Sequence, residues 1–207
     1  NSWTDVANTT TSLVTGPLTQ TSHYRAVVAS GSCPAVTTNE FEVAVTSSGI
    51  WTGVVNANWN NAGNWCGGIP TGSTNVVIPA GTVNSPVINV AANVNSITVD
   101  AGATLSFTGS GNSVDLKGDL VVNGTFNTAN GTVIFSGTGT QNVAGIPYSV
   151  LRMNGTGLKS LTGNATVTSS LDLVSGNLQL GNFNLVAGSS ATAGGSASSY
   201  IVTNGSG

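Results

Sequence analysis

Short bursts of alternating apolar and polar residues, each closed by Gly or Asn, fill residues 94–126 and constrain the fold more than any other feature. Apolar residues stand at every second position, as in the pairs Ile97 and Val99, Leu105 and Phe107, Val114 and Leu116, and Leu120 and Val122. A period of two is typical of a strand with one buried face, and Gly and Asn tolerate the positive φ of tight turns. The stretch predicts the middle of a stack of short β-strands.

Similar segments continue along residues 74–207 with no helical pattern between them. VDLKGDLVVNGTF, from Val114, resembles LDLVSGNLQLGNF, from Leu171, if one residue is inserted in the second copy. Strands and turns that repeat without helices favour a β-solenoid, similar to a parallel β-helix, whose coils bury their faces against one another. An ordinary antiparallel β-sandwich is the alternative. Strands are expected at 75–79, 86–90, 132–135, 141–145, 149–153, 158–161, 165–168, 171–174, 177–180, 182–186 and 200–203.

Residues 1–48 form a separate unit. Strands are expected at 13–18, 23–28 and 41–45, the last two joined as a hairpin by a loop with Gly, Ser and Pro. Tyr24 is placed like the tyrosine corner of an immunoglobulin-like sandwich, which needs about seven strands. We therefore expect the C-terminal strands of a partial immunoglobulin-like domain, with the other strands before Asn1. Both chain ends look cut, so the sequence is expected to be part of a longer protein.

Residues 49–73 form a tryptophan-rich junction between these two parts. Trp51, Trp59 and Trp65 are three of the four tryptophans of the chain. One interpretation is a platform on which pyranose rings stack, as in a carbohydrate-binding module. The other is a cap that covers the open end of the solenoid and its unpaired strand edges. The position at the solenoid boundary favours the cap.

Charged residues make up only 5% of the chain, against about 25% in ordinary soluble domains. Four basic residues and a net charge of −3 leave no electrostatic surface for nucleic acid or an anionic membrane. The sequence also lacks an apolar run long enough to insert into a membrane. Neither nucleic acid nor the bilayer is therefore an expected partner.

The acids suggest no catalytic centre. Asp115 and Asp119 are the best candidate pair for a polysaccharide-degrading enzyme, but both lie on the polar phase of the alternation, where solvated acids are the rule. His23 is the only histidine, and no GxSxG motif accompanies the serines. Asp100 or Asp115 could bind calcium, but no DxDxDG run supports a site. We expect no catalytic residue, no cofactor and no metal.

Two cysteines in a chain so poor in charge fit an oxidising, extracellular compartment. Cys33 lies in the loop of the first unit and Cys66 lies in the junction. A disulfide between them would fix the angle between the two units. The alternative is that one of them pairs with a residue outside this sequence.

Two stretches resemble a known family. TSHYRAVVASGSCPAVTTNEFEVAV is similar to the last strands of immunoglobulin-like repeats in very large cell-surface proteins of Bacteroidetes, and WTGVVNANWNNAGNWCGGIPTGSTNVVIPAG resembles the start of the β-helical segment that follows such repeats. The family includes gliding-motility adhesins exported by the type IX secretion system. The resemblance implies an extracellular or cell-surface location, contact with that secretion machinery, and a non-catalytic role in adhesion or as a stalk. Surface polysaccharides or other cell-surface proteins are the expected partners.

Overall fold

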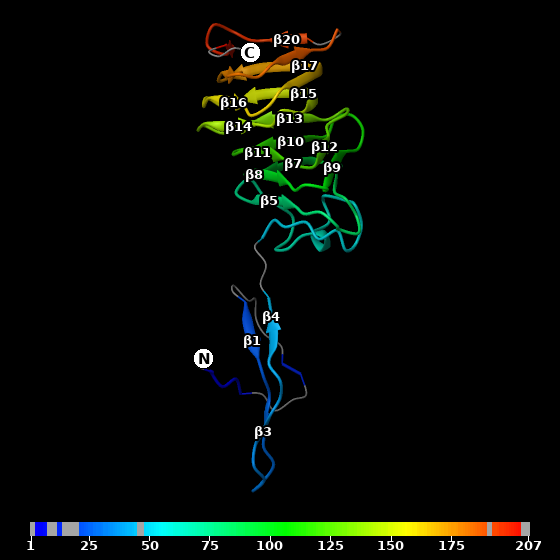
Figure 1. Cartoon of the computed structure of the whole chain (residues 1–207), viewed down its shortest axis with the longest axis vertical. Helices are drawn as coiled ribbons and strands as arrows, with labels where there is room; N and C mark the ends of the chain where they lie inside the picture. The colour runs from blue at the N-terminus through cyan, green and yellow to red at the C-terminus, as the bar shows by residue number, and fades with distance from the viewer. Residues whose placement is uncertain (1–2, 8–11, 14–20, 45–47, 190–191, 204–207) are drawn as a thin grey trace. The chain divides into compact units, whose positions relative to one another are not determined.

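The computed structural model describes residues 3–7, 12–13, 21–44, 48–189 and 192–203 (Figure 1). The chain divides into two compact units, Asn1–Thr46 and Ser47–Gly207. The protein is all-β, and the second unit is a β-solenoid of about six turns. The solenoid and the all-β class that the alternation predicts are therefore confirmed.

The first unit contains two short antiparallel pairs. Strand β1 (Ser22–Tyr24) pairs with β4 (Phe41–Val43), and β2 (Val27–Val28) pairs with β3 (Val36–Thr37). Together they form the hairpin that the sequence predicts, interrupted between its two ladders. The predicted strand at 13–18 lies almost wholly outside the described residues. None of the described residues of this unit is buried, and the strands among them do not form the two packed sheets of an immunoglobulin-like sandwich.

The solenoid strands run parallel and line three sides of each early coil (Figure 1). Asn75 and Asn95 are hydrogen-bonded across two successive coils, as are Arg152 and Asp172, and the partners are 20 residues apart in each case. One coil therefore takes about 20 residues. The first face consists of β5 (Asn75–Ile78), β8 (Ser96–Val99) and β11 (Leu120–Val122), and the second of β6 (Val87–Ile88), β9 (Thr104–Phe107) and β12 (Thr125–Asn127).

The third face is the largest sheet. It contains β7 (Ala91–Val94), β10 (Ser113–Leu116), β13 (Thr132–Phe135), β15 (Pro147–Asn154) and β17 (Ala165–Ser175), and both β19 (Leu185–Ala187) and β20 (Thr192–Gly194) pair with β17. A fourth sheet, with β14 (Gln141–Val143), β16 (Lys159–Leu161), β18 (Leu178–Gln179) and β21 (Ile201–Val202), continues the first face in the later coils. The two sheets meet where the Asn142 backbone N–H donates to Asp119 Oδ1 over 2.8 Å.

The core is a set of side-chain columns, because parallel in-register strands place equivalent residues above one another. One column on the third face contains Val94, Leu116, Phe135, Met153 and Leu173, each in register with the next and each buried. Burying such apolar area contributes about 25 cal/mol per Å². The period-two pattern of the sequence is thus converted into a continuous hydrophobic interior.

Two predicted strands, 165–168 and 171–174, are joined as the single strand β17. Its N-terminal half pairs with β19 and its C-terminal half with β20, and its pairing with β15 shifts in register after Tyr148. A β-bulge of this kind bends a strand without ending it. In the early coils the second and third faces each have a strand of their own. In the later coils one long bent strand covers both faces.

Candidate functional site

The tryptophan junction forms a layer beneath the first coil. Ile50 bridges Val77 of β5 and Asn58 bridges Val87 of β6, both in parallel orientation. The Trp51 N–H donates to Val77 O over 3.0 Å, and the Trp59 N–H donates to Val87 O over 3.1 Å. These bonds occupy the edge of the first coil that would otherwise be unpaired.

The three indole rings are packed inside this layer. Trp65 lies edge to face with Trp51 and with Trp59, at centroid distances of 4.9 and 4.6 Å. Trp51 Nε1 donates to Asn84 O over 2.7 Å, and Trp65 Nε1 donates to Trp59 O over 2.8 Å. The exposed fractions of Trp51, Trp59 and Trp65 are 0, 1 and 5%. A sugar cannot stack on a buried ring, so the burial of these rings favours the cap over the platform.

Asn64 organises the loop between the tryptophans. It ends the short 3-10 helix η1 (Ala62–Asn64) and is completely buried. Its Oδ1 accepts from the backbone N–H groups of Val55 and Asn56, and its Nδ2 donates to Asn56 Oδ1 and Asn58 O. A buried amide with all its bonds made rigidifies its surroundings. The Asn-rich composition of the junction therefore has a structural cause.

Asp115 and Asp119, the best candidate pair of acids, lie on different faces of the solenoid. Asp115 lies on the third face, accepts a hydrogen bond from Ser136 Oγ and lies 3.3 Å from Lys117 Nζ. Asp119 lies beyond the corner at Gly118, at the start of the first-face strand β11, where it accepts two hydrogen bonds from Asn142. The two carboxylates thus belong to different faces and have different partners.

The other candidate polar residues are dispersed. His23 Nδ1 lies 2.6 Å from Glu40 Oε1 in the first unit, with both side chains about half exposed. Asp100 lies in the turn after β8, where its carbonyl oxygen accepts from the Ala103 N–H. In the described ranges, no three His, Cys, Asp or Glu side chains gather closely enough to hold a metal ion. The same ranges contain no helix with the length and hydrophobicity needed to cross a bilayer.

The predicted disulfide is not formed in the structure, where both cysteines are free. Cys33 lies exposed in the first unit and Cys66 lies half-buried in the second, and neither sulfur is bonded to another.

Thiol titration of the unreduced protein distinguishes two free cysteines from a disulfide. Two thiols per chain should react with an aromatic disulfide reagent, Cys33 faster than Cys66 because access limits the rate. Cys33→Ser should remove the faster phase. A count below two thiols in denaturant without reductant would contradict the free state.

A row of polar side chains runs along the first face and its continuation, with one residue in each coil. Asn75 is in register with Ser96, whose Oγ accepts from the Asp119 N–H over 3.0 Å. Asp119 is bonded to Asn142, and the row continues in register to Ser160 and Gln179. None of its members is buried. We call this set the polar row: Asn75, Ser96, Asp119, Asn142, Ser160 and Gln179.

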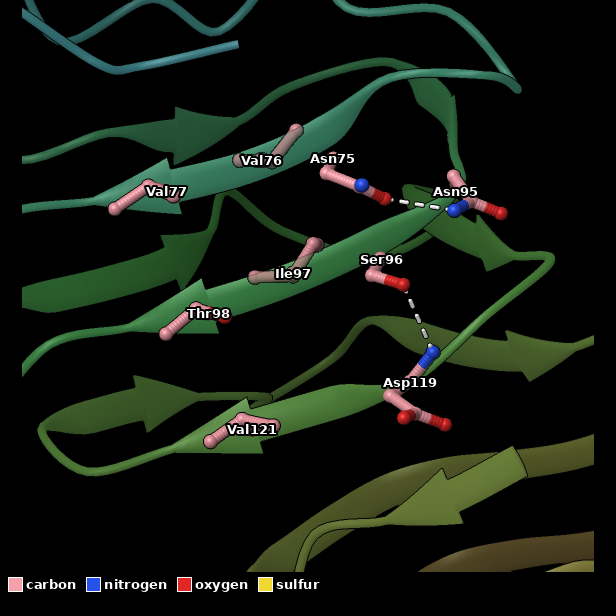
Figure 2. Close-up of a pocket in the computed structure, with 9 residues that line it drawn as sticks. All are labelled: Asn75, Val76, Val77, Asn95, Ser96, Ile97, Thr98, Asp119 and Val121. Atoms are coloured by element: carbon pink, nitrogen blue, oxygen red, sulfur yellow. Dashed lines mark hydrogen bonds between the residues drawn. The ribbon is translucent and has the colours of Figure 1, made fainter. Parts of the chain in front are cut away.

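Beside the first half of the polar row lies an open depression of about 340 Å³ (Figure 2). Val77, Thr98 and Val121 are in register on β5, β8 and β11 and form its apolar side, which we call the strip. Asn95 Nδ2 donates to Asn75 Oδ1 over 2.7 Å at the other side. Sequence reasoning did not single out this surface, because the step between its members varies from 18 residues for Asn142 and Ser160 to 23 for Asp119 and Asn142.

Lys159 is the second feature that sequence reasoning did not find. Its side chain is completely buried, and its Nζ donates to Gly137 O, Gly155 O and Gly157 O over 2.8, 3.2 and 2.9 Å. Burial lowers the pKa of this amine from its ordinary value. Three donors match three carbonyl acceptors, so Lys159 completes the hydrogen bonding of a turn that crosses two coils.

Glycine makes the close approach at this corner possible. A Cβ atom on Gly155 would overlap Gly137 O, and one on Gly157 would overlap Gly139 O. One coil earlier, the buried Gln141 has a similar role, since its Nε2 donates to Leu116 O over 3.1 Å and its Oε1 accepts from the Gly137 N–H. The corner is therefore a structural element of the solenoid.

Comparison with known families gives two matches. The family described as Domain of unknown function (DUF8696) matches residues 1–47, and the one described as Domain of unknown function (DUF8693) matches residues 50–157. The border between the two matches falls at the division between the compact units. No curated protein and no solved structure matches the chain. Since the second match spans the cap, the first coils and more than half of the sequence, the chain belongs to the family described as Domain of unknown function (DUF8693).

Proposed function

We propose that this chain is a non-catalytic structural and adhesive segment of a large secreted or surface-anchored bacterial protein. The observation that carries this proposal is the in-register stack of parallel coils, closed at one end by the tryptophan cap. Such a stack is a rod, because each coil adds one strand separation of about 4.8 Å to its length. A rod holds an adhesive surface away from the body that bears it.

The hydrogen bonds of the solenoid support a mechanical role. They run between coils, along the axis, and a load on the rod is shared by the strands of every face. The ladder between β15 and β17 alone contains seven residue pairs. Breaking one coil away requires most of these bonds to fail together, and a structure of this kind is stiff along its axis.

The remaining parts of the proposal rest on the sequence resemblance described above. The first unit would supply C-terminal strands of an immunoglobulin-like domain, and its antiparallel pairs are compatible with that role. Export by the type IX system and a cell-surface location follow from the same resemblance. The partners would be surface polysaccharides or other cell-surface proteins. The alternative of a polysaccharide-degrading enzyme gains no support from Asp115 and Asp119, which lie on separate faces.

Single-molecule force spectroscopy on the whole chain tests the mechanical proposal. With handles at both ends, the solenoid should unfold in a few cooperative events, each releasing about 3.3–3.6 Å of contour length per residue. The first unit, with no buried residue among those described, should extend at lower force. Smooth extension of the entire chain, without resolved unfolding events, would contradict the role of a stiff spacer.

A further inference from the structure

The polar row places one polar side chain in every coil from β5 to β18. Its members are amides, hydroxyls and one carboxylate. Adjacent strands lie about 4.8 Å apart, so successive members are offered at about that interval along the axis. This interval is close to the length of one pyranose residue in an extended glycan chain.

The surroundings of the row define the charge of a suitable ligand. Neither the row nor the residues that line the depression include Lys, Arg or His. Asp119 would repel an anionic polymer, because its carboxylate is bonded to the neutral Asn142 and forms no ion pair with any residue that the structure describes. Amide and hydroxyl groups exchange hydrogen bonds readily with sugar hydroxyls, and the strip offers apolar contact to the C–H face of a ring. The chemistry therefore suits an uncharged polyhydroxylated chain.

We propose that the polar row and the strip form a binding track for a linear neutral polysaccharide that lies parallel to the solenoid axis. This inference rests on the adhesive part of the proposed function and names the ligand class and the face that binds it. The ligand begins in the depression of Figure 2, where Val77, Thr98 and Val121 lie beside Asn75, Ser96 and Asp119. It continues over Asn142 and Ser160 in the later coils. No aromatic platform takes part, since the rings of the cap are buried.

Titration calorimetry of the whole chain with uncharged hexasaccharides tests the track. Cellohexaose, xylohexaose, mannohexaose and N-acetylchitohexaose are the probes, and hexagalacturonate is the anionic comparison. At least one neutral probe should bind more tightly than a Kd of about 1 mM, and its trisaccharide should bind at least tenfold more weakly because it spans fewer coils. The anionic probe should bind more weakly than the neutral one.

Matched variants locate the site. Val121→Lys places a long side chain across the strip at a position that is 40% exposed, whereas Val174→Lys makes the same change on the third face at a position that is 59% exposed. Val121→Lys should weaken binding at least tenfold, and Val174→Lys should leave it unchanged. Circular dichroism and the melting temperature of both variants should remain those of the parent protein.

Three results would overturn the proposal. The first is that no neutral hexasaccharide binds; the second is that Val121→Lys binds like the parent; the third is that sedimentation shows a self-association, abolished by Val121→Lys, without any glycan binding. In the third case the face is an interface between copies of the chain. Each result leaves the force experiment unaffected, so loss of the track is distinguishable from loss of the spacer role.

Discussion

Trp65→Ala should lower the free energy of unfolding of the solenoid by about 3–5 kcal/mol, the usual cost of truncating a buried large aromatic residue. Trp65 lies between Trp51 and Trp59 and makes edge-to-face contact with both. Its removal also deprives Trp59 O of the donor Nε1 at 2.8 Å. The first coil then loses the layer that covers its edge. Urea unfolding followed by far-ultraviolet circular dichroism measures the effect.

Trp3→Ala is the control for Trp65→Ala. Trp3 lies in the first unit with 36% of its surface exposed, and the Arg25 guanidinium lies 4.1 Å from its ring centroid. An exposed cation–π pair contributes about 0.5–1 kcal/mol, so this variant should lose no more than that. Equal losses in the two variants would refute the cap.

Lys159→Met should cost about 2–4 kcal/mol of unfolding free energy. The substitution keeps most of the side-chain volume but leaves the carbonyls of Gly137, Gly155 and Gly157 without their shared donor. An unsatisfied buried acceptor costs about 1–3 kcal/mol, and the sum is reduced because the ammonium no longer has to be desolvated. Lys117→Met is the matched control, since Lys117 is 43% exposed in its ion pair with Asp115 and such pairs contribute about 1 kcal/mol or less. If Lys117→Met lost as much unfolding free energy as Lys159→Met, the role of Lys159 as the shared donor to these three carbonyls would be refuted.

The same lysine predicts a pH dependence. Because burial lowers the pKa of Lys159 in the folded state, the unfolded chain, with an ordinary pKa of about 10.4, binds more protons between the two values. The free energy of unfolding therefore rises with pH in this interval. The stability difference between the parent and Lys159→Met should grow as the pH rises through this interval toward about pH 10. Burial raises the pKa of Tyr148, which destabilises both proteins in stronger alkali and cancels in the difference.

The solenoid was predictable because its signal is local. Inward residues such as Val114 and Leu116 alternate with outward ones, and Gly or Asn marks the corners. The internal repeat was predictable for the same reason: Val114 in β10 and Leu171 in β17 lie on the same sheet. The tryptophans were correctly placed at the solenoid boundary, although the sequence alone left their exposure open.

The polar row was not predictable, because it depends on the number of residues that each corner absorbs. Ser160 and Asn142 align only after the lengths of both coils are known. Lys159, in contrast, left a signal that was overlooked. It shares the inward phase of β16 with Leu161, while Ser160 occupies the outward phase. A lysine in an inward phase beside several glycines indicates that backbone carbonyls surround its ammonium group, since a buried ammonium needs acceptors.

The immunoglobulin-like part was the least predictable. Its assignment rested on the position of Tyr24 and on a family resemblance, and the described strands of the first unit are two short antiparallel pairs. A sandwich is defined by contacts between two sheets that are far apart in sequence, and local pattern does not encode such contacts. The free cysteines have a similar explanation, because residue spacing gives no distance between two sulfur atoms.

Uniform stacking also bears on how such a protein can change length during evolution. Each coil of the third face meets the next through the same parallel ladder, whether the pair is β7 with β10 or β13 with β15. A duplicated segment of about 20 residues would therefore find a ready template on either side and could be inserted without altering the cap. The resemblance between the segments beginning at Val114 and Leu171 is what such duplication would leave behind. The length of the solenoid would then be a heritable quantity, adjustable by whole coils through recombination.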